Sequence, residues 1–426
     1  MSIRRVAITG LGLMTPCGQG WQPYWQAVVE GRSHINFISA LSIENYPHKL
    51  GGEIRDFNPG EYIKQRKSLK VMSREIQLAV VASHLALLDS AIKLPETDLT
   101  RFGISLGTGV INNDLDEIGA GIRSGLDESG KFSMNKFGQS GIRSLFPLWF
   151  LKYLPNMPAC HISMTHGLQG PNNTITTSST AGVQAIGEAY KVIQRGDADL
   201  MIAGSTDSKI NAMGISRFQL LGLLSKHETN PETAYCPFDR KHDGIVLGEG
   251  AGLVVLEDWE HAKKRGAKIY AELTGYGCAS DFHHDQHFRE DIQGKRGAMV
   301  RALSDAQVNP DEVDLLMANG SGVPQDDRME ARAVESVFEN SLRDLKVTGV
   351  KPITGHLVYG SGGVELGAAA LSLYEGVIPQ LANFETPDPG CDLPFVKKSE
   401  HSSVRRLVLN SFGFGGQNAS LVLRKA

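Results

Sequence analysis

Residues 173–203 read NTITTSSTAGVQAIGEAYKVIQRGDADLMIA and contain a complete strand–helix–strand pattern. Asn173–Ser178 favours a strand, and the segment that follows, Ser179–Arg195, repeats apolar side chains at helical spacing. Gly196 is placed to end that helix, and Leu200–Ala203 begins a second buried strand. This order of elements decides the fold class, because strands that alternate with helices are typical of α/β proteins.

The same alternation continues through the rest of the chain. Further strands are predicted at Arg5–Leu13, Phe102–Gly109, Ala251–Leu256, Val313–Ala318, Leu345–Val350, Val404–Ser411 and Ala419–Arg424. Further helices are predicted at Ser73–Ile92, Ala298–Leu303, Met329–Phe338 and Gly362–Tyr374. The short, almost continuous apolar runs predict an α/β fold with largely parallel, buried sheets.

The composition is that of a folded chain. Of 426 residues, 41% are hydrophobic and 21% are charged, which is enough to bury a large core. The net charge of −4 gives no general attraction for nucleic acid. No apolar run reaches the roughly 18 residues that indicate a membrane span.

The cysteines and the N-terminal residues bear on the cellular compartment. Five scattered cysteines fit neither a disulfide framework nor a CxxC metal site. The N-terminal residues pass directly into a strand pattern, without the apolar core of a signal peptide. We therefore expect a cytoplasmic protein that binds no metal and no nucleic acid and has no membrane span.

Ser179, at the turn between the predicted strand and helix, is the first candidate for chemistry. Such a turn displays its residue on an exposed corner at the positive end of the helix dipole, where backbone N–H groups can stabilise an oxyanion. A cysteine there would be a ready thiolate, whereas a serine hydroxyl needs a separate base. The structural alternative is an N-cap serine that satisfies free N–H groups.

Three further segments place polar or aromatic residues next to predicted strands. His356 closes the run Lys351-Pro-Ile-Thr-Gly-His356 and could be a general acid or base, or an oxyanion donor. Asn319 can donate a hydrogen bond but cannot take a proton. The loop Ser411–Asn418 could bring backbone amides and Phe414 close to a ligand. The alternatives are a structural histidine, a polar strand end and a tight turn between two strands.

Order and spacing make these segments informative together. The chain resembles the β-ketoacyl-acyl carrier protein synthases, condensing enzymes of the thiolase-like fold, almost from end to end. The matching segments are Val6–Gly12, Gly170–Pro171, residues 174–183, Gly196–Gly204, Pro237–Gly250, Thr354–His356 and Ser411–Asn418. The resemblance implies two similar halves, 1–250 and 251–426, in a five-layer αβαβα arrangement, and an intimate dimer.

The resemblance also implies a catalytic set, which this chain matches unevenly. The nucleophile position, a cysteine in the family, is Ser179, and the first histidine position is Asn319. The second histidine is present as His356, and the lysine that orients it is Lys351. The gating phenylalanine is Phe414, with Gly415 and Gly416 as substrate-binding positions. Two of the three core catalytic groups are therefore missing.

This pattern indicates a condensing-enzyme fold that has lost its own chemistry and kept its dimer interface. We expect a chain-length-factor-like, non-catalytic subunit of a type II polyketide or polyene ketosynthase heterodimer. Its role would be to shape the acyl tunnel of an active, cysteine-bearing partner. One alternative is an active 3-oxoacyl-carrier protein synthase variant or malonyl decarboxylase that uses His356. Another is a Ser179-dependent acyltransferase or thioesterase.

Two segments bear on the expected partners. The basic run Lys64–Lys70 could contact an acidic acyl carrier protein, or it could be a solvated helix face. Gly109–Leu126 is the candidate for the lining of the tunnel. We expect no bound cofactor apart from the phosphopantetheine arm that the carrier protein brings.

Overall fold

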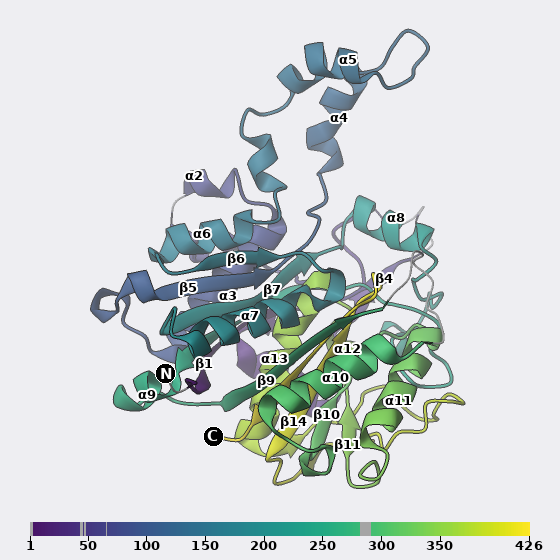
Figure 1. Cartoon of the computed structure of the whole chain (residues 1–426). Helices are drawn as coiled ribbons and strands as arrows, with labels where there is room; N and C mark the ends of the chain where they lie inside the picture. The colour runs from purple at the N-terminus through teal and green to yellow at the C-terminus, as the bar shows by residue number, and fades with distance from the viewer. Residues whose placement is uncertain (1–2, 43–45, 47, 65, 282–290) are drawn as a thin grey trace.

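The computed structural model describes residues 3–42, 46, 48–64, 66–281 and 291–426. Ten strands form the body of the molecule (Figure 1). They are β1 (Val6–Thr15), β5 (Phe102–Gly107), β6 (Asn172–Ile175), β7 (Leu200–Ser208), β8 (Glu249–Asp258), β9 (Ala271–Ser280), β10 (Leu315–Met317), β11 (Lys346–Thr348), β14 (Arg406–Phe412) and β15 (Gln417–Arg424). Five two-residue strands are β2 (Gly18–Gln19), β3 (Asn36–Phe37), β4 (Leu50–Gly51), β12 (Val377–Ile378) and β13 (Glu400–His401).

The long strands fall into two groups with the same internal order. The first group is arranged β1-β8-β7-β5-β6, and the second β9-β15-β14-β10-β11. If the five strands of each group are numbered along the chain, both groups have the same spatial order: first, fifth, fourth, second, third. The groups meet where Val6–Ile8 of β1 pair with Ala271–Leu273 of β9. The repeated order supports a chain of two similar halves, and the division at residue 250 stays a proposal.

Strand pairing is mixed rather than largely parallel, which corrects the prediction from sequence. β5 runs parallel to β6 and β7, and β10 runs parallel to β11 and β14. β1, β8, β9 and β15 pair antiparallel with their neighbours. A strand buried on both faces has a continuous apolar run whatever its direction, so the pattern could not reveal this.

Helices cover both groups of strands and fill the space between the two groups. α7 (Ala181–Arg195) and α13 (Ser361–Glu375) contact strands of both halves and form the central layer. α3 (Arg74–Ser90) and α6 (Met157–His166) lie outside the first half, while α10 (Gln293–Ala306) and α11 (Pro324–Phe338) lie outside the second. The expected five-layer αβαβα arrangement is confirmed. The other helices of the body are α1 (Trp21–Glu30), α2 (Arg66–Leu69), α8 (Ala212–Leu220), α9 (Trp259–Lys264) and α12 (Lys351–Thr354).

The strand–helix–strand unit has boundaries that differ slightly from the prediction. β6 ends at Ile175, and α7 begins only at Ala181, because Ser178–Thr180 forms a 3₁₀ turn between them. Gly196 ends α7 as expected, with a left-handed φ of 82° that favours glycine. The turn is the place where the site is built.

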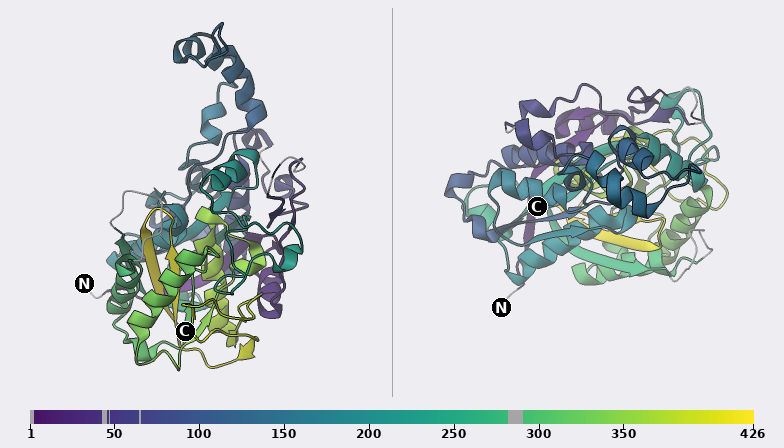
Figure 2. Two further views of the ribbon diagram at one scale, coloured as in Figure 1. Left: turned by 90° about the vertical axis from the view of Figure 1, so that its right-hand side faces the viewer. Right: turned by 90° about the horizontal axis from the view of Figure 1, so that it is seen from above.

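Residues 110–156 leave the body as a projecting arm, which contains α4 (Leu115–Ser124) and α5 (Met134–Lys136) (Figures 1 and 2). At its root, the Tyr153 hydroxyl donates a 2.7 Å hydrogen bond to Glu117. Ten of the nineteen exposed large hydrophobic side chains found among the described residues lie between Val110 and Phe150. Exposed apolar surface on this scale marks a site of interaction with another molecule.

A membrane span finds no support in the described part of the chain, since none of its helices is both long and apolar enough.

Candidate functional site

Ser179 lies in the 3₁₀ turn between β6 and α7. Its side chain is not on an exposed corner, as the sequence predicted: the residue is 1% exposed. Strands β14 and β15 contact the turn and cover it, and Ser411 Oγ donates a 3.2 Å hydrogen bond to the Ser179 carbonyl oxygen. The Oγ atom of Ser179 has no hydrogen-bond partner in the described structure. Ser179 is therefore not an N-cap, and its hydroxyl is buried.

Asn319 follows strand β10, and its side chain has a fixed orientation. Its Oδ1 accepts hydrogen bonds from the backbone N–H of Phe412 and from the Lys351 ammonium, each 3.2 Å long. Because both partners are donors, the oxygen faces them and Nδ2 points the other way. Nδ2 is buried, and no acceptor for it is found among the residues that the structure describes. Since Ser411 and Phe412 are adjacent on β14, their bonds bring Ser179 and Asn319 together.

Two buried carboxylates support Asn319 and Lys351. Lys351 Nζ also donates to the Asn319 carbonyl oxygen and lies 2.5 Å from Glu365 Oε1. Glu330 accepts hydrogen bonds from the backbone N–H groups of Asn319 and Gly320 at 2.7 and 2.8 Å. Burial raises the pKa of Glu330 to about 7. Neither glutamate was predicted from the sequence. The only signal for a buried carboxylate was an acidic residue next to small or apolar residues in a predicted helix.

His356 is held in one tautomer by its neighbour in the chain. The backbone N–H of Val358 donates a 3.0 Å hydrogen bond to Nδ1 of His356. Val358 adopts a left-handed φ of 48°, which is rare for a β-branched residue and marks a strained position. Since Nδ1 accepts, the hydrogen of the neutral ring is on Nε2. That atom is buried and has no partner in the part of the chain that is described.

The environment of His356 keeps its ring uncharged. Burial, and to a smaller extent the positive charge of Lys351, lowers the pKa of His356 well below its usual value. A neutral imidazole with its hydrogen on Nε2 donates a hydrogen bond from that atom and cannot take a proton there. His356 and Asn319 are therefore both donors, suited to stabilising negative charge on an oxygen.

Phe414 lies in the loop that joins β14 to β15. Its ring centroid is 5.6 Å from that of His356 and 6.3 Å from that of Phe218. Gly416 closes the loop with a φ of 77°, and its N–H donates to the Gly413 carbonyl oxygen at 3.1 Å. Open space surrounds Gly415. The loop thus places Phe414 directly beside His356.

A pocket of about 440 Å³ opens next to this loop. Its wall includes Ser178, Lys209, Phe218, Val358, Tyr359 and Phe414. Ser178 and Val358 are neighbours of Ser179 and His356 in the chain, so the pocket reaches the backbone on which the candidate groups are mounted. A ligand that entered past Phe414 would approach them through this pocket.

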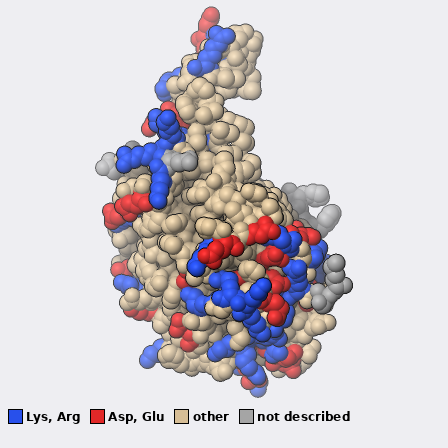
Figure 3. Space-filling view, turned by 90° about the vertical axis from the view of Figure 1, so that its left-hand side faces the viewer, with Lys and Arg blue, Asp and Glu red and all other residues tan. Residues whose placement is uncertain are grey.

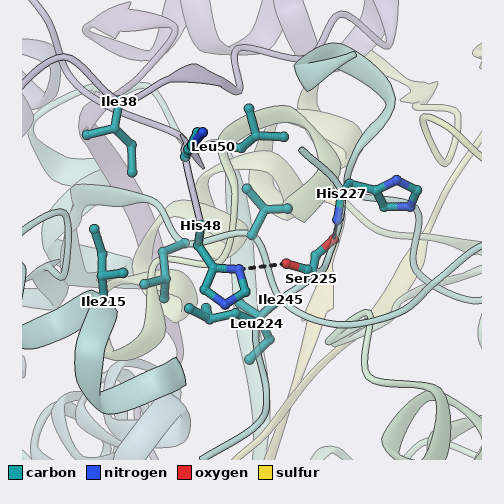
Figure 4. A pocket seen from close by; sticks show the side chains of 11 residues that line it. Ile38, His48, Leu50, Ile215, Leu224, Ser225, His227 and Ile245 are labelled. Carbon is teal, nitrogen blue, oxygen red and sulfur yellow. Dashed lines mark hydrogen bonds between the residues drawn. The ribbon is translucent and has the colours of Figure 1, made fainter. Parts of the chain in front are cut away.

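A second hollow, between α8 and β4, is much smaller (Figure 4). Its volume is about 10 Å³, which leaves room for roughly one water molecule. Isoleucine and leucine side chains form most of its lining, and Nδ1 of His48 bonds to the Ser225 carbonyl oxygen at 2.9 Å. It is too small to bind a substrate.

Comparison with known proteins agrees with this architecture. Residues 3–262 match the family model of the β-ketoacyl synthase N-terminal domain, and residues 270–385 match that of the C-terminal domain. The chain belongs to the β-ketoacyl synthase family. It is 35% identical to 3-oxoacyl-[acyl-carrier-protein] synthase 2 of Coxiella burnetii, over 100% of this chain and 99% of that protein.

Solved β-ketoacyl synthase structures resemble the chain over its full length. The ishigamide ketosynthase/chain length factor matches with a TM-score of 0.87 and 28% identity, covering 100% of both chains. A second match is a chain of the solved complex of a type II polyketide acyl-carrier protein with its ketosynthase bound to the hexaketide. The TM-score is 0.83 at 28% identity, again with 100% of both chains covered. The thiolase-like ketosynthase fold expected from the sequence is confirmed.

In this member of the β-ketoacyl synthase family, the structure brings together the candidate catalytic residues that the sequence singled out. Ser179, Asn319, Lys351 and His356 are buried around one site, and Phe414 lies at its edge. Their roles in a reaction remain proposals. The described residues contain no group of three or more His, Cys, Asp or Glu side chains arranged to hold a metal ion.

Proposed function

We propose that this β-ketoacyl synthase family member is a chain-length-factor-like, non-catalytic subunit. It would pair with an active, cysteine-bearing ketosynthase that extends polyketide or polyene chains on an acyl carrier protein. One observation carries the proposal: the hydrogen bond from Val358 to Nδ1 of His356 prevents this histidine from acting as a base for Ser179.

Ser179 needs a base because a serine hydroxyl is a weak nucleophile until its proton is removed. Nε2 of His356 already carries a hydrogen, and Asn319 presents an amide. Neither group can accept the proton. Since general base assistance contributes about 10²–10⁴-fold to a rate, attack of Ser179 on a thioester is expected to be slow. This argues against the serine acyltransferase or thioesterase alternative.

The projecting arm supports a partner chain. Its apolar side chains, such as Met134 and Phe150, are 74% and 60% exposed. Burying them would remove apolar area from water, which is the main favourable term in protein association. The predicted tunnel-lining segment, Gly109–Leu126, forms the root and first helix of the arm. A tunnel shared with a partner would therefore be built from both chains.

The basic run supports contact with an acidic carrier protein. Lys64, Arg66, Lys67 and Lys70 are all exposed on or beside α2. Figure 3 shows Lys and Arg side chains gathered just below the arm, on the side of the molecule where Figure 1 places α2. Complementary charge would steer the two proteins together. The carrier protein would bring the phosphopantetheine arm, and no resident cofactor is proposed.

A second candidate function is decarboxylation of a malonyl thioester, and the unpaired donors favour it. Nδ2 of Asn319 and Nε2 of His356 are both buried without acceptors among the described residues. A malonyl group could lose its carboxylate as CO₂ and leave an enolate, whose oxygen two such donors would stabilise. Protonation of the enolate carbon would give the acetyl thioester. This reaction requires no nucleophile at Ser179.

Co-expression with a cysteine-bearing ketosynthase from the same organism tests the leading proposal. The purified complex is incubated with acyl- and malonyl-carrier protein, and the intact mass of each chain is measured. A one-to-one complex with acyl adducts on the partner alone is expected. An adduct on Ser179, or a stable homodimer that condenses alone, would overturn the proposal.

The arm offers a matched pair of variants for the same experiment. Met134→Glu with Phe150→Glu should abolish co-purification, because two charges would have to be buried at the contact. Leu88→Glu is the control, since Leu88 is 64% exposed on α3, outside the arm. An intact complex with the arm variant would show that the contact lies elsewhere.

A further inference from the structure

Lys209 and Tyr359 line the pocket beside Phe414. Leu220 and Leu221 line the same pocket, and because they are 88% and 40% exposed they mark its mouth. Lys209 lies directly after β7 and is only 2% exposed, although its side chain is charged. Tyr359 belongs to the turn Val358–Gly360, three residues after His356. A group that entered at the mouth would meet these two side chains last.

One carboxylate holds both residues in place. Asp207 Oδ1 accepts a 2.5 Å hydrogen bond from Lys209 Nζ, and its Oδ2 accepts a 3.2 Å hydrogen bond from the backbone N–H of Tyr359. The Lys209 ammonium also lies 5.3 Å from the centre of the Tyr359 ring, within cation–π range. Asp207 thus fixes the Lys209 ammonium and the backbone of Tyr359, and the ammonium lies over the Tyr359 ring.

Behind them lies the root of the arm. Lys209 Nζ donates a 2.9 Å hydrogen bond to the carbonyl oxygen of Val110, which is 49% exposed. The Tyr359 ring is packed on the backbone of Gly109, so closely that a Cβ atom added there would lie 2.0–2.2 Å from three ring carbons. Tyr359 and Lys209 therefore lie between the pocket and the root of the arm, where Gly109 is buried and Val110 is exposed.

We propose that Lys209 and Tyr359 are a wall that limits the length of acyl group this chain's own pocket accepts. A phosphopantetheine thioester with a short acyl group fits in front of the wall. A long acyl chain would have to displace an aromatic ring and a buried ion pair, so it is excluded from the pocket. This inference rests on the proposed function because it takes a carrier-bound acyl thioester as the ligand.

The wall also fits a subunit that shapes a tunnel without catalysing the reaction. A chain growing in the partner's active site and running along the root of the arm would meet Gly109 and Val110 from the other side. Lys209 and Tyr359 would keep that chain out of the disused Ser179 site. The same two side chains would thus separate one acyl path from the other.

Tyr359→Ala is the variant that opens the wall. It removes the ring and keeps the backbone N–H that bonds to Asp207. Lys209→Met is less suitable, because it would leave Asp207 buried without its cation. Leu221→Ala is the matched control, since it shortens a side chain at the mouth of the same pocket.

The experiment measures the affinity of acetyl- and dodecanoyl-pantetheine, as stable amide analogues, by calorimetry. It uses the complex with the partner ketosynthase, whose active-site cysteine is alkylated first. Binding at the partner's alkylated site is common to every variant, so a difference between Tyr359→Ala and Leu221→Ala reports on the wall between the two acyl paths. Equal unfolding temperatures show that the variants are folded.

Tyr359→Ala is expected to bind the dodecanoyl analogue at least about tenfold more tightly than the unmodified complex does. Affinity for the acetyl analogue should change little, and Leu221→Ala should leave the preference for short chains unaltered. The same dodecanoyl affinity in the unmodified and Tyr359→Ala complexes would overturn the wall. Loss of the complex itself would instead contradict the proposed function.

Discussion

Lys351 Nζ lies 2.5 Å from Glu365 Oε1, and the side chains of both residues are 3% exposed. The pair joins the segment before His356 to the central helix α13. The same ammonium also binds Asn319. The buried charge of Lys351 therefore fixes both Asn319 and the segment that ends at His356, which are far apart in the sequence.

Removing this charge should destabilise the fold strongly. Lys351→Met leaves the Glu365 carboxylate buried without its cation, and the unfolding free energy should fall by about 3–5 kcal/mol. The double variant Lys351→Met with Glu365→Leu should recover most of the loss, because an apolar pair of similar volume needs no charge compensation. Urea unfolding measures both. A loss below about 1 kcal/mol for the single variant would contradict a dry ion pair.

Ser179→Cys should create a reactive thiol without restoring condensation. The N-terminal end of α7 favours the thiolate, so the new cysteine should be alkylated by iodoacetamide, as peptide mass analysis would show. Condensation on carrier protein should need Asn319→His as well. The single variant should be about 10²-fold slower than the double one. Asn319→His alone is the control. Full condensation activity of Ser179→Cys alone would contradict the prediction, because it would show that asparagine at position 319 supports condensation without a histidine.

The two unpaired donors can be tested through decarboxylation. If the second candidate function holds, His356→Ala should lower the rate of CO₂ release from malonyl-carrier protein by about 10²–10³-fold, since one oxyanion donor is lost. Asn319→Ala should have a similar effect. The partner subunit is inactivated at its own site for this assay. Ser179→Ala serves as the control and should leave the rate unchanged, because the hydroxyl takes no part in decarboxylation.

Glu330 should make stability depend on pH. Burial raises its pKa to about 7 in the folded state, above the value of roughly 4.3 of a free glutamate. The folded state therefore binds the proton more tightly, and this contribution to stability is full below about pH 4 and is lost as the pH rises through 7. The unfolding free energy should fall by roughly 4 kcal/mol across that window.

A neutral amide at this position should flatten the pH profile. Glu330→Gln cannot titrate, so urea unfolding between about pH 4 and 8 should show a smaller fall than in the unmodified protein. Glu75 also has a pKa raised by burial to about 7, and Glu75→Gln is the matched variant that removes its separate share. Profiles of equal slope for Glu330→Gln and the unmodified protein would contradict the assignment.

Much of the site could be predicted from the sequence because its signals are local. The strand–helix turn at Ser179 and the run that ends at His356 are each encoded within a dozen residues. Gly196 ends its helix because glycine tolerates a left-handed backbone, and a glycine can be recognised directly in the sequence. The serine and the asparagine at positions 179 and 319 are equally visible, where the family resemblance leads us to expect a cysteine and a histidine.

The remainder depended on contacts between distant segments, which only the tertiary structure decides. Strand direction, the burial of Ser179 under β14 and the projection of the arm all follow from how the two halves pack. The hydrogen on Nε2 of His356 follows from the backbone turn at Val358. The wall of Lys209 and Tyr359 exists because Asp207 binds residues two and 152 positions away. The hydrophobic periodicity of a segment predicts whether it forms a helix or a strand. The burial and protonation of its side chains depend on the other segments that pack against it.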